Sequence, residues 1–302
     1  MIDKLTYLLA LARETHFGRA AESCGVTQPA FSAGIRALEE SLGMVLVGRS
    51  SRFLGFTPEG ERVLVWARQI VGDVQAMHAD LRALKTGLNG LLRIAVIPTA
   101  LTAVADLTTP YHARHPQVRL SVQSCTSNDV LRRLDNFEID VGITYLGNEP
   151  TGRKRVVPLY QECYHLLTKE ASPYKNANTV TWSEVSGLPL GLLTTDMQNR
   201  RIIERLLKNA GKFEPPRLES NSITVLISHA QAGFLSCILP EILIRPLGRQ
   251  IGLRAIPIVS PRKVQTVGLV LPEREPISPL VAALLATLPN RPSPDISMPG
   301  QL

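Results

Sequence analysis

Residues 17–43 read FGRAAESCGVTQPAFSAGIRALEESLG, and this stretch decides the fold of the N-terminal part of the chain. A short helix is expected over about Gly18–Cys24, and Gly25 after it permits a sharp turn. Thr27 is a favourable N-cap for the next helix, and Pro29 falls in its first turn, where a missing N–H costs nothing. Two short helices joined by a tight glycine turn predict a helix-turn-helix.

Helical spacing on both sides of this turn defines the expected core. The second helix of the motif has one apolar stripe and stops at Gly43, which suits a C-terminal cap. An earlier helix with one apolar stripe ends near His16. The expected core positions are Phe31, Ile35, Leu38 and Leu42 in the former helix, and Leu5, Leu8, Leu9 and Ala12 in the latter.

The polar N-terminal face of the motif's second helix is the candidate DNA reader. Gln28 can pair with adenine in the major groove, and Ser32 can reach a base or a phosphate. Two short strands, Met44–Gly48 and Phe53–Phe56, flank a turn whose arginines can meet phosphates or a minor groove. Any three-helix bundle also has a polar face, so these features alone leave a purely structural role open. The candidate DNA-binding residues are Thr27, Gln28, Pro29, Ala30, Ser32, Ala33, Arg36, Arg49 and Arg52.

A long helix follows, because Thr57, Pro58 and Glu59 provide an N-cap, a first-turn proline and a first-turn acid. Its apolar residues alternate four and three positions apart, a repeat of about 3.5 residues that predicts a dimerisation seam between two copies of the chain. The alternative is that the stripe packs on its own domain. The predicted seam is Val63, Ala67, Ile70, Val74, Met77, Leu81, Leu84 and Leu88.

The sequence pattern changes near Gly87–Gly90. Beyond it, short β-branched runs alternate with helical stretches, which indicates βαβ units and a mainly parallel sheet. The expected fold is therefore α/β with an N-terminal all-α winged helix-turn-helix. The expected strands are Leu91–Ile97, Val118–Ser124, Ile139–Tyr145, Val156–Tyr160, Leu188–Leu193, Phe234–Leu239 and Thr266–Leu271.

The 302 residues include 33 Lys and Arg and 26 Asp and Glu, a net charge of +7. A basic chain favours nucleic acid as a partner, yet residues 1–90 hold ten basic and nine acidic residues, and residues 91–302 hold 23 and 17. Most of the excess, 23 − 17 = +6, therefore lies outside the helix-turn-helix. Four scattered cysteines without a CxxC pair favour a reduced, cytoplasmic protein, and no apolar run reaches the roughly 18 residues of a membrane helix.

Motifs over residues 12–51 and 56–61 closely resemble the winged helix-turn-helix of LysR-type transcriptional regulators. The C-terminal part is similar to the effector domain of this family, so the resemblance covers the chain to about residue 290. The chain departs from the family at Ala33 and Gly34, where Arg and Gln are usual, and at Val47-Gly48-Arg49, where Phe-Glu-Arg is common. The resembling motifs are Phe17-Gly18-Arg19-Ala20-Ala21, Thr27-Gln28-Pro29-Ala30, Leu38-Glu39-Glu40, Leu42-Gly43 and Thr57-Pro58-Glu59-Gly60.

The resemblance implies two periplasmic-binding-protein-like α/β subdomains with a small-molecule cleft between them. It also implies a DNA-binding tetramer that is a dimer of dimers. The hinge is expected at Cys163–Leu166 and Gln265–Gly268. The expected domains are a winged helix-turn-helix (1–58), a dimerisation helix (59–89) and an effector-binding domain (90–302), which comprises subdomain I (about 91–163 and 265–290), subdomain II (about 164–264) and a disordered tail (291–302).

The effector site is expected at the carboxyl ends of strands and at helix N-termini, where ligands of doubly wound domains bind. The hydroxyl and backbone N–H groups there suit a small anion such as a carboxylate, and Arg200 and Arg201 would add charge. The same loops line the effector cleft in the LysR-type family. For each single Thr or Ser the alternative is a helix cap. The candidate effector-binding residues are Pro98, Thr99, Ala100, Thr126, Ser127, Thr144, Tyr145, Thr195 and Asn199.

Together these features predict a ligand-responsive transcription factor at the nucleoid. Its expected partners are double-stranded DNA, a small effector, further copies of the chain and RNA polymerase. No GxSxG, HExxH, GxGxxG or P-loop motif occurs, so no catalytic residue, cofactor or metal is expected. Cys125 and Cys237 are expected to be buried structural thiols, with a redox pair as the alternative. Two other functions stay open: a substrate-binding or transport module with a helical dimerisation extension, and an enzyme on the α/β domain.

Overall fold

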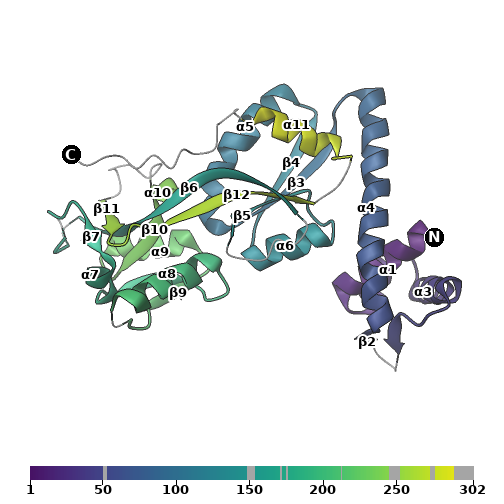
Figure 1. Cartoon of the computed structure of the whole chain (residues 1–302), viewed down its shortest axis with the longest axis horizontal. Coiled ribbons are helices and arrows are strands. Elements are labelled where there is room, and N and C mark those ends of the chain that lie inside the picture. Colours follow the sequence, from purple (N-terminus) through teal and green to yellow (C-terminus); the bar gives the residue numbers. More distant parts are fainter. Residues whose placement is uncertain are drawn as a thin grey trace. The chain divides into compact units, whose positions relative to one another are not determined.

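The computed structural model describes residues 1–49, 53–147, 154–170, 172–174, 176–211, 213–244, 252–272 and 276–288. They form two compact units, one built on Met1–Asn89 and one on the chain from Gly90 onward (Figure 1). None of the described helices combines the length and the hydrophobicity that a membrane span requires. The predicted disordered tail, 291–302, lies outside the described residues.

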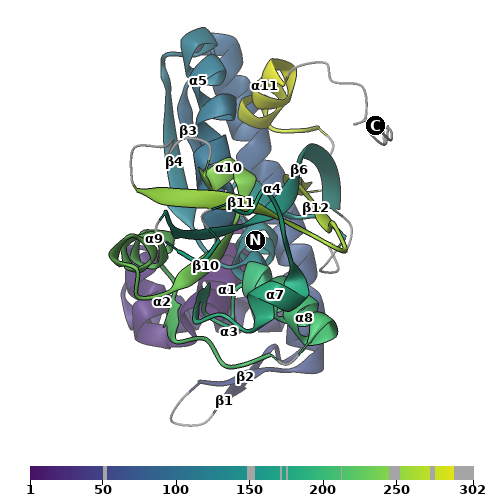
Figure 2. The same ribbon diagram turned by 90° about the vertical axis from the view of Figure 1, so that its left-hand side faces the viewer.

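The first unit is a winged helical bundle, as the sequence predicts. Its strands β1 and β2 pair antiparallel and form the wing hairpin (Figure 2). The elements of this unit are α1 (Ile2–Glu14), α2 (Phe17–Ser23), α3 (Gln28–Leu42), β1 (Val47–Arg49), β2 (Phe53–Phe56) and α4 (Pro58–Thr86).

The core of this unit lies between the apolar faces of α1, α2, α3 and the first half of α4. The expected members Leu9 and Ala12 are only half-buried at its edge, and Leu11 is fully buried in their place. Leu42 is 37% exposed, because it lies in the last turn of α3. The buried residues are Leu5, Leu8, Ala10, Leu11, Ala20, Ala21, Phe31, Ile35, Leu38, Leu46, Val47, Leu64, Ala67 and Val71.

The helix ends are capped as the sequence predicts. Thr27 Oγ1 accepts a hydrogen bond from the backbone N of Ala30 at 3.4 Å, and Thr57 Oγ1 accepts one from Gly60 N at 3.0 Å. Gly43 ends α3 in the left-handed conformation, with φ of 67°, a conformation that favours glycine. These caps fix where α3 and α4 begin, and so which of their faces meets the core.

The second unit is the α/β part. Its elements are β3 (Gly90–Val96), η1 (Pro98–Ala103), α5 (Val104–Arg114), β4 (Val118–Ser124), α6 (Ser127–Asp135), β5 (Val141–Tyr145), β6 (Lys154–Lys169), β7 (Val180–Thr181), α7 (Trp182–Ser186), β8 (Leu190–Leu193), α8 (Gln198–Ala210), β9 (Leu218–Ser220), α9 (Ile223–Ala232), β10 (Ser236–Pro240), α10 (Glu241–Ile244), β11 (Leu253–Val259), β12 (Val264–Pro272) and α11 (Pro279–Thr287).

The sheet follows the order β4-β3-β5-β12-β6-β10-β8-β9, and β11 pairs with β6 and β7. β3 pairs parallel with β4 and β5, and β8 pairs parallel with β9 and β10. The prediction of a mainly parallel sheet is wrong in the middle, where β12 runs antiparallel to β5 and β6. The reason is that β6 carries the chain from one set of parallel strands to the other and β12 brings it back.

β6 is much longer than the predicted strand Val156–Tyr160. Up to Cys163 it pairs with β12, and from Tyr164 onward it pairs with β10 and β11. The two halves of the α/β unit are therefore subdomains that share β6, and the strand changes partners inside the predicted hinge. β11 was not expected from the sequence, because Pro257 interrupts its apolar alternation.

Candidate functional site

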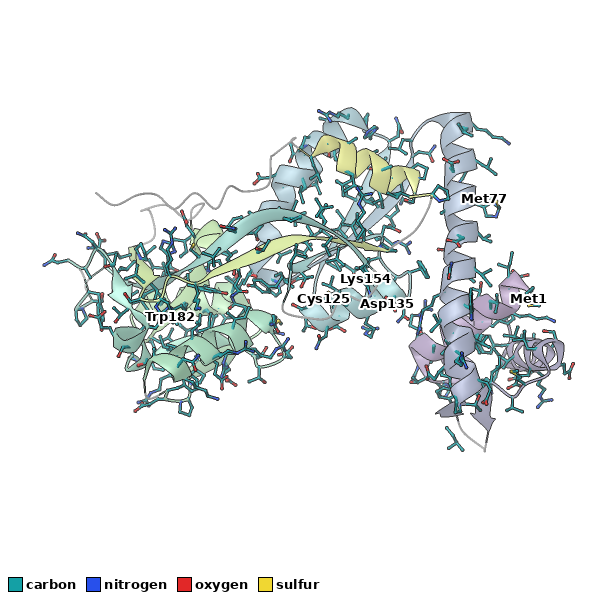
Figure 3. All side chains as sticks on the ribbon, viewed as in Figure 1. Met1, Met77, Cys125, Asp135, Lys154 and Trp182 are labelled. Carbon is teal, nitrogen blue, oxygen red and sulfur yellow. The ribbon has the colours of Figure 1, made fainter. Side chains whose placement is uncertain are left out.

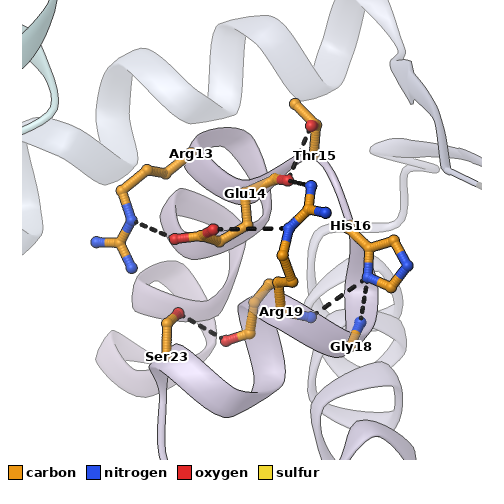
Figure 4. A network of polar contacts seen from close by, with 8 residues as sticks. Arg13, Glu14, Thr15, His16, Gly18, Arg19 and Ser23 are labelled. Atoms are coloured by element: carbon orange, nitrogen blue, oxygen red, sulfur yellow. Dashed lines mark hydrogen bonds and ion pairs between the residues drawn. The ribbon is translucent and has the colours of Figure 1, made fainter.

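The corner between α1 and α2 is held by a small polar network (Figure 4). His16 Nδ1 accepts hydrogen bonds from the backbone N of Gly18 at 3.1 Å and of Arg19 at 3.3 Å, and so caps α2. Arg19 Nη2 donates to the carbonyl of Glu14 at 2.7 Å. These bonds fix the first helix of the helix-turn-helix on α1.

The predicted DNA-reading residues on α3 form a surface at its N-terminal half. Ser32 is half-buried, and the other predicted residues there are exposed. Gln28 Oε1 lies 3.5 Å from the place where a Cβ on Gly18 would stand, so its carboxamide lies over the start of α2. The exposed members are Thr27, Gln28, Pro29, Ala30, Ala33 and Arg36.

Gly34 lets α3 approach α1 closely. A Cβ at this position would lie 2.7 Å from Cδ2 of Tyr7, which is closer than real Cβ contacts. The Tyr7 ring also stacks on Phe31, with ring centroids 5.0 Å apart. From the sequence alone, Gly34 is only a departure from the family pattern. The pattern does not show that Gly34 packs against Tyr7.

The wing is tied to α3 by Glu39, a role that the sequence did not reveal. Glu39 Oε1 accepts hydrogen bonds from the backbone N of Leu46 at 2.9 Å and of Val47 at 3.1 Å. Arg52 lies outside the described residues, as does the side chain of Arg49. Contacts of these two arginines with DNA therefore stay a prediction.

The predicted seam of α4 divides into two parts. Ala67 is buried in the core of its own unit and Val63 packs against it, so both are removed from the candidate seam. Val74 and Leu88 are half-buried. Farther along, the side chains stand exposed, and Leu84 is 79% exposed. The exposed stripe, which includes the unpredicted Trp66, comprises Trp66, Ile70, Met77 (labelled in Figure 3), Leu81 and Leu84.

The α/β unit contains a pocket with an empty volume of about 190 Å³, here called the Tyr145 pocket. It lies beyond the carboxyl ends of β3, β5 and β8, and at the N-termini of α6 and α8, as expected for a doubly wound domain. Five predicted effector residues line it, and both subdomains contribute. The lining residues are Ile97, Pro98, Thr99, Ser127, Tyr145, Leu193, Met197, Gln198 and Asn199.

The hydroxyl group of Tyr145 connects three side chains at this pocket. It donates to Glu162 Oε1 at 2.7 Å, lies 3.0 Å from Thr99 Oγ1 and accepts from Asn199 Nδ2 at 3.2 Å. Thr99 and Tyr145 belong to one subdomain and Asn199 to the other, so this hydroxyl joins the two. Burial raises the pKa of Tyr145 well above that of a free tyrosine and raises the pKa of Glu162 to about 8.

Ser127 and two helix ends make the pocket suitable for an anion. The Ser127 hydroxyl is buried and has no hydrogen-bond partner among the described residues. Ser127 is the first residue of α6, and Gln198 and Asn199 are the first residues of α8. Backbone N–H groups at helix N-termini attract negative charge.

Four predicted effector residues do not line the pocket. Thr126 caps α6, since its Oγ1 accepts from Asp129 N at 3.1 Å, so the helix-cap alternative holds for it. Thr195 is exposed, because it lies in the loop before α8. Ala100 and Thr144 are buried outside the lining.

The two arginines expected to add charge differ in their partners. Arg200 is buried, and its guanidinium pairs with Glu204 at 3.1 Å and with Glu219. Arg201 Nε donates to Gln198 Oε1 at 2.7 Å. The expectation that Arg200 charges the pocket is therefore wrong, whereas Arg201 stays next to the lining through Gln198.

Of the two cysteines expected to be buried structural thiols, Cys237 is buried and Cys125 is only half-buried. Burial raises the pKa of Cys237 to about 12 and also raises the pKa of Cys125. None of the described residues that line the Tyr145 pocket is a cysteine. Among the described residues no three His, Cys, Asp or Glu side chains gather as metal ligands.

Comparison with known proteins gives matches over nearly the whole chain. The model of the LysR substrate binding domain matches residues 85–292, and that of the bacterial regulatory helix-turn-helix protein, lysR family, matches residues 2–61. The chain is 30% identical over 280 residues to the hydrogen peroxide-inducible genes activator of Escherichia coli O6:H1, covering 92% of this chain and 90% of that protein.

Two solved structures share the fold. A full-length OxyR variant from Pseudomonas aeruginosa superposes with a TM-score of 0.74 and 24% identity, covering 95% of this chain and 97% of that one. CbnR in complex with its target DNA gives a TM-score of 0.59 and 22% identity, covering 95% and 98%.

Proposed function

Because the chain belongs to the LysR family of DNA-binding transcriptional regulators, we propose that it reads operator DNA with α3 and senses a small anion in the Tyr145 pocket. The observation that carries the ligand-sensing part is the unpartnered Ser127 hydroxyl where the N-termini of α6 and α8 meet. A buried hydroxyl without a partner is costly unless something binds it.

For DNA recognition, α3 enters the major groove with its exposed N-terminal face. Gln28 reads a base through its carboxamide, and Arg36, one turn farther on, contacts a phosphate. Ala33 offers only a methyl group, which suits contact with a thymine methyl. The wing, held by Glu39, brings Arg49 and Arg52 to the backbone.

The pocket limits the ligand to a small molecule. Its empty volume of about 190 Å³ includes space that is open to solvent, so the enclosed part is smaller still. A short carboxylate satisfies both the size and the anion-binding equipment. No metal or cofactor enters this proposal.

Ligand binding reaches the DNA through the angle between the two subdomains. Thr99 and Asn199 approach the Tyr145 hydroxyl from opposite subdomains. A ligand that binds one arrangement more tightly shifts the population toward it. In the proposed division, residues 90–302 form the effector domain and residues 1–58 the DNA-binding domain.

The exposed stripe of α4 dimerises the protein. Trp66, Ile70, Met77, Leu81 and Leu84 would be buried against the same stripe of a second copy. Such a dimer presents two α3 helices to two half-sites, and two dimers form the tetramer. The protein would act on chromosomal DNA in the cytoplasm, where RNA polymerase is a further partner.

The relatives named for hydrogen peroxide raise a second candidate, thiol oxidation, which the proposal leaves aside. A thiolate is the form that reacts with peroxide. The raised pKa values of Cys125 and Cys237 keep both protonated at neutral pH. The proposed signal is therefore reversible ligand binding rather than oxidation of these two thiols.

Footprinting on the DNA upstream of the protein's own gene tests this function. Specific protection is expected, and a bound small carboxylate should move the footprint edges or change the DNA bend. Absence of specific DNA binding would favour the alternative of a non-enzymatic binding module. Turnover of the bound ligand would favour the enzyme alternative.

A further inference from the structure

The buried carboxyl group of Glu162 has no part in the proposed function so far. It lies on β6 just before the strand changes partners, and the residue is 2% exposed. Its Oε1 accepts the hydrogen bond from Tyr145, whereas its Oε2 has no hydrogen-bond partner among the described residues. A carboxyl group so poorly solvated is costly to ionise, so its proton state affects whatever it contacts.

The Tyr145 hydroxyl has one proton and hydrogen bonds with three side chains, whereas the nearby Tyr164 hydroxyl makes no hydrogen bond among the described residues. Asn199 Nδ2 can only donate to it, so the Tyr145 proton goes either to Glu162 or to Thr99. An ionised Glu162 takes this proton, and Thr99 must then donate to Tyr145. A protonated Glu162 can instead donate to Tyr145, which then donates to Thr99.

The direction of this chain decides what Thr99 offers to a ligand, because Thr99 lines the pocket. With Glu162 ionised, Thr99 turns only lone pairs to the pocket, and a negative charge lies behind Tyr145. Both repel an anion. With Glu162 protonated, the charge is absent and the Thr99 proton is free to bond a ligand oxygen.

We infer that Glu162 is the specificity-determining residue of the Tyr145 pocket, and that a small carboxylate binds together with one proton, which Glu162 takes up. The inference rests on the proposed assignment of this pocket to a small anion. Glu162 acts through Tyr145, so it is a positioning residue. The proton comes from solvent and stays on the Glu162 carboxyl group, and no bond to the ligand is made or broken.

The surroundings of Glu162 favour a proton exchange near neutral pH. Burial raises its pKa to about 8. The titratable side chains facing it are Tyr145 from β5 and Tyr160 and Tyr164 from its own strand, and burial raises the pKa of each. β12, its pairing neighbour, carries no titratable side chain. Glu162 therefore titrates before the groups that face it.

Other titratable groups lie farther along β6. Burial lowers the pKa of His165, which is near Glu241 of α10 and Arg262. Arg262 Nη2 lies 3.7 Å from Cys163 Sγ. Because these groups can contribute to a pH profile, the test must compare the native chain with a chain in which only position 162 cannot titrate.

Acetate and acetamide are matched probes, because they have nearly the same shape and differ in charge. Calorimetry on the full chain from pH 6 to 10 should show acetate affinity falling by up to tenfold per pH unit above the ionisation of Glu162. Enthalpies measured in buffers of different ionisation heat should show about one proton taken up per acetate there. Acetamide affinity should not change with pH.

Glu162→Gln supplies a permanent donor to Tyr145 and mimics the protonated state. It should bind acetate with the low-pH affinity of the native chain at every pH. Tyr145→Phe breaks the relay and keeps the Glu162 charge, so its acetate affinity should depend less steeply on pH than that of the native chain. Circular dichroism confirms that each variant is folded, so either one carries the test if the other does not fold.

Three results would overturn the inference. They are an acetate affinity of the native chain that does not change with pH, the same pH dependence of acetate affinity in Glu162→Gln, and absence of acetate binding at every pH. Acetate that binds as described and leaves the DNA footprint unchanged contradicts the proposed function only. A footprint that responds to another ligand while acetate fails to bind overturns the inference only.

Discussion

The Tyr7 ring packs on the bare Cα of Gly34, at the place where α1 and α3 cross. A methyl group there would lie 2.7 Å from Tyr7 Cδ2. Overpacking of this kind costs about 1–3 kcal/mol, whereas a glycine in a helix costs only about 1 kcal/mol relative to alanine. The close contact thus outweighs the helix propensity that Gly34 gives up.

Gly34→Ala should therefore lower the free energy of unfolding by about 1 kcal/mol in the native chain, as the net of these two effects. In a Tyr7→Ala background the same substitution should raise it by about 0.5–1 kcal/mol, because only helix propensity remains. Urea unfolding of the four chains measures both values. The same sign in both backgrounds would show that Tyr7 is not what forbids a side chain at Gly34.

Gln28→Ala should weaken binding to the operator far more than binding to unrelated DNA, because a base contact is lost. One good base contact contributes about 1–3 kcal/mol of discrimination. Arg36→Ala should weaken both and lower the salt slope by about 1, because a phosphate contact is lost. Fluorescence anisotropy at several salt concentrations checks both. Equal losses of Gln28→Ala on the two DNAs would refute its role in reading bases.

Leu81→Glu should disrupt dimers, because it places two like charges in the apolar stripe of α4. Gln75→Glu is the matched control, since it adds the same charge at another exposed position of this helix. Sedimentation should give a smaller species for the first variant and a native-sized one for the second. Native-sized Leu81→Glu would place the dimer contact outside this stripe.

Hydrogen peroxide should not change DNA binding through Cys125 or Cys237. The reason is that the raised pKa values of Cys125 and Cys237 keep both thiols protonated. Footprints with and without peroxide provide the measurement, and Cys125→Ser and Cys237→Ala serve as variants if a response occurs. A response that either variant abolishes would establish thiol sensing in place of ligand sensing.

Stability should fall as the pH rises through the titration of Glu162. The carboxyl pKa is about 8 in the folded chain against 4.5 for a free glutamic acid. Between pH 4.5 and about pH 8 the folded chain holds a proton that the unfolded chain has lost. The contribution of Glu162 to the free energy of unfolding is therefore complete below pH 4.5 and is lost by about pH 8. The slope is at most about 1.4 kcal/mol per pH unit. Urea unfolding of the native chain and of Glu162→Gln between pH 5 and 8 should show this slope in the native chain alone.

Local signals in the sequence determined the helix-turn-helix, the caps at Thr27 and Thr57, and the class of the α/β part. Each depends on residues a few positions apart, because helix periodicity and capping are short-range. The candidate pocket loops followed from the rule for carboxyl ends of strands. That rule identified Thr99, Ser127 and Asn199, and it wrongly included the helix cap Thr126.

Only the tertiary structure decided which side chains act together. Tyr145 meets Thr99, Glu162 and Asn199 across 46, 17 and 54 positions of sequence. These residues meet in space because β6 and β12 join two sets of parallel strands. The periodicity of the sequence does not encode this strand order. The tertiary structure also decided which apolar residues of α4 are buried in its own unit and which are exposed. Their repeat in the sequence is uniform and does not distinguish the two sets. The first turns of α4 face a core built by α1 to α3, and its exposed stripe is left for a second copy.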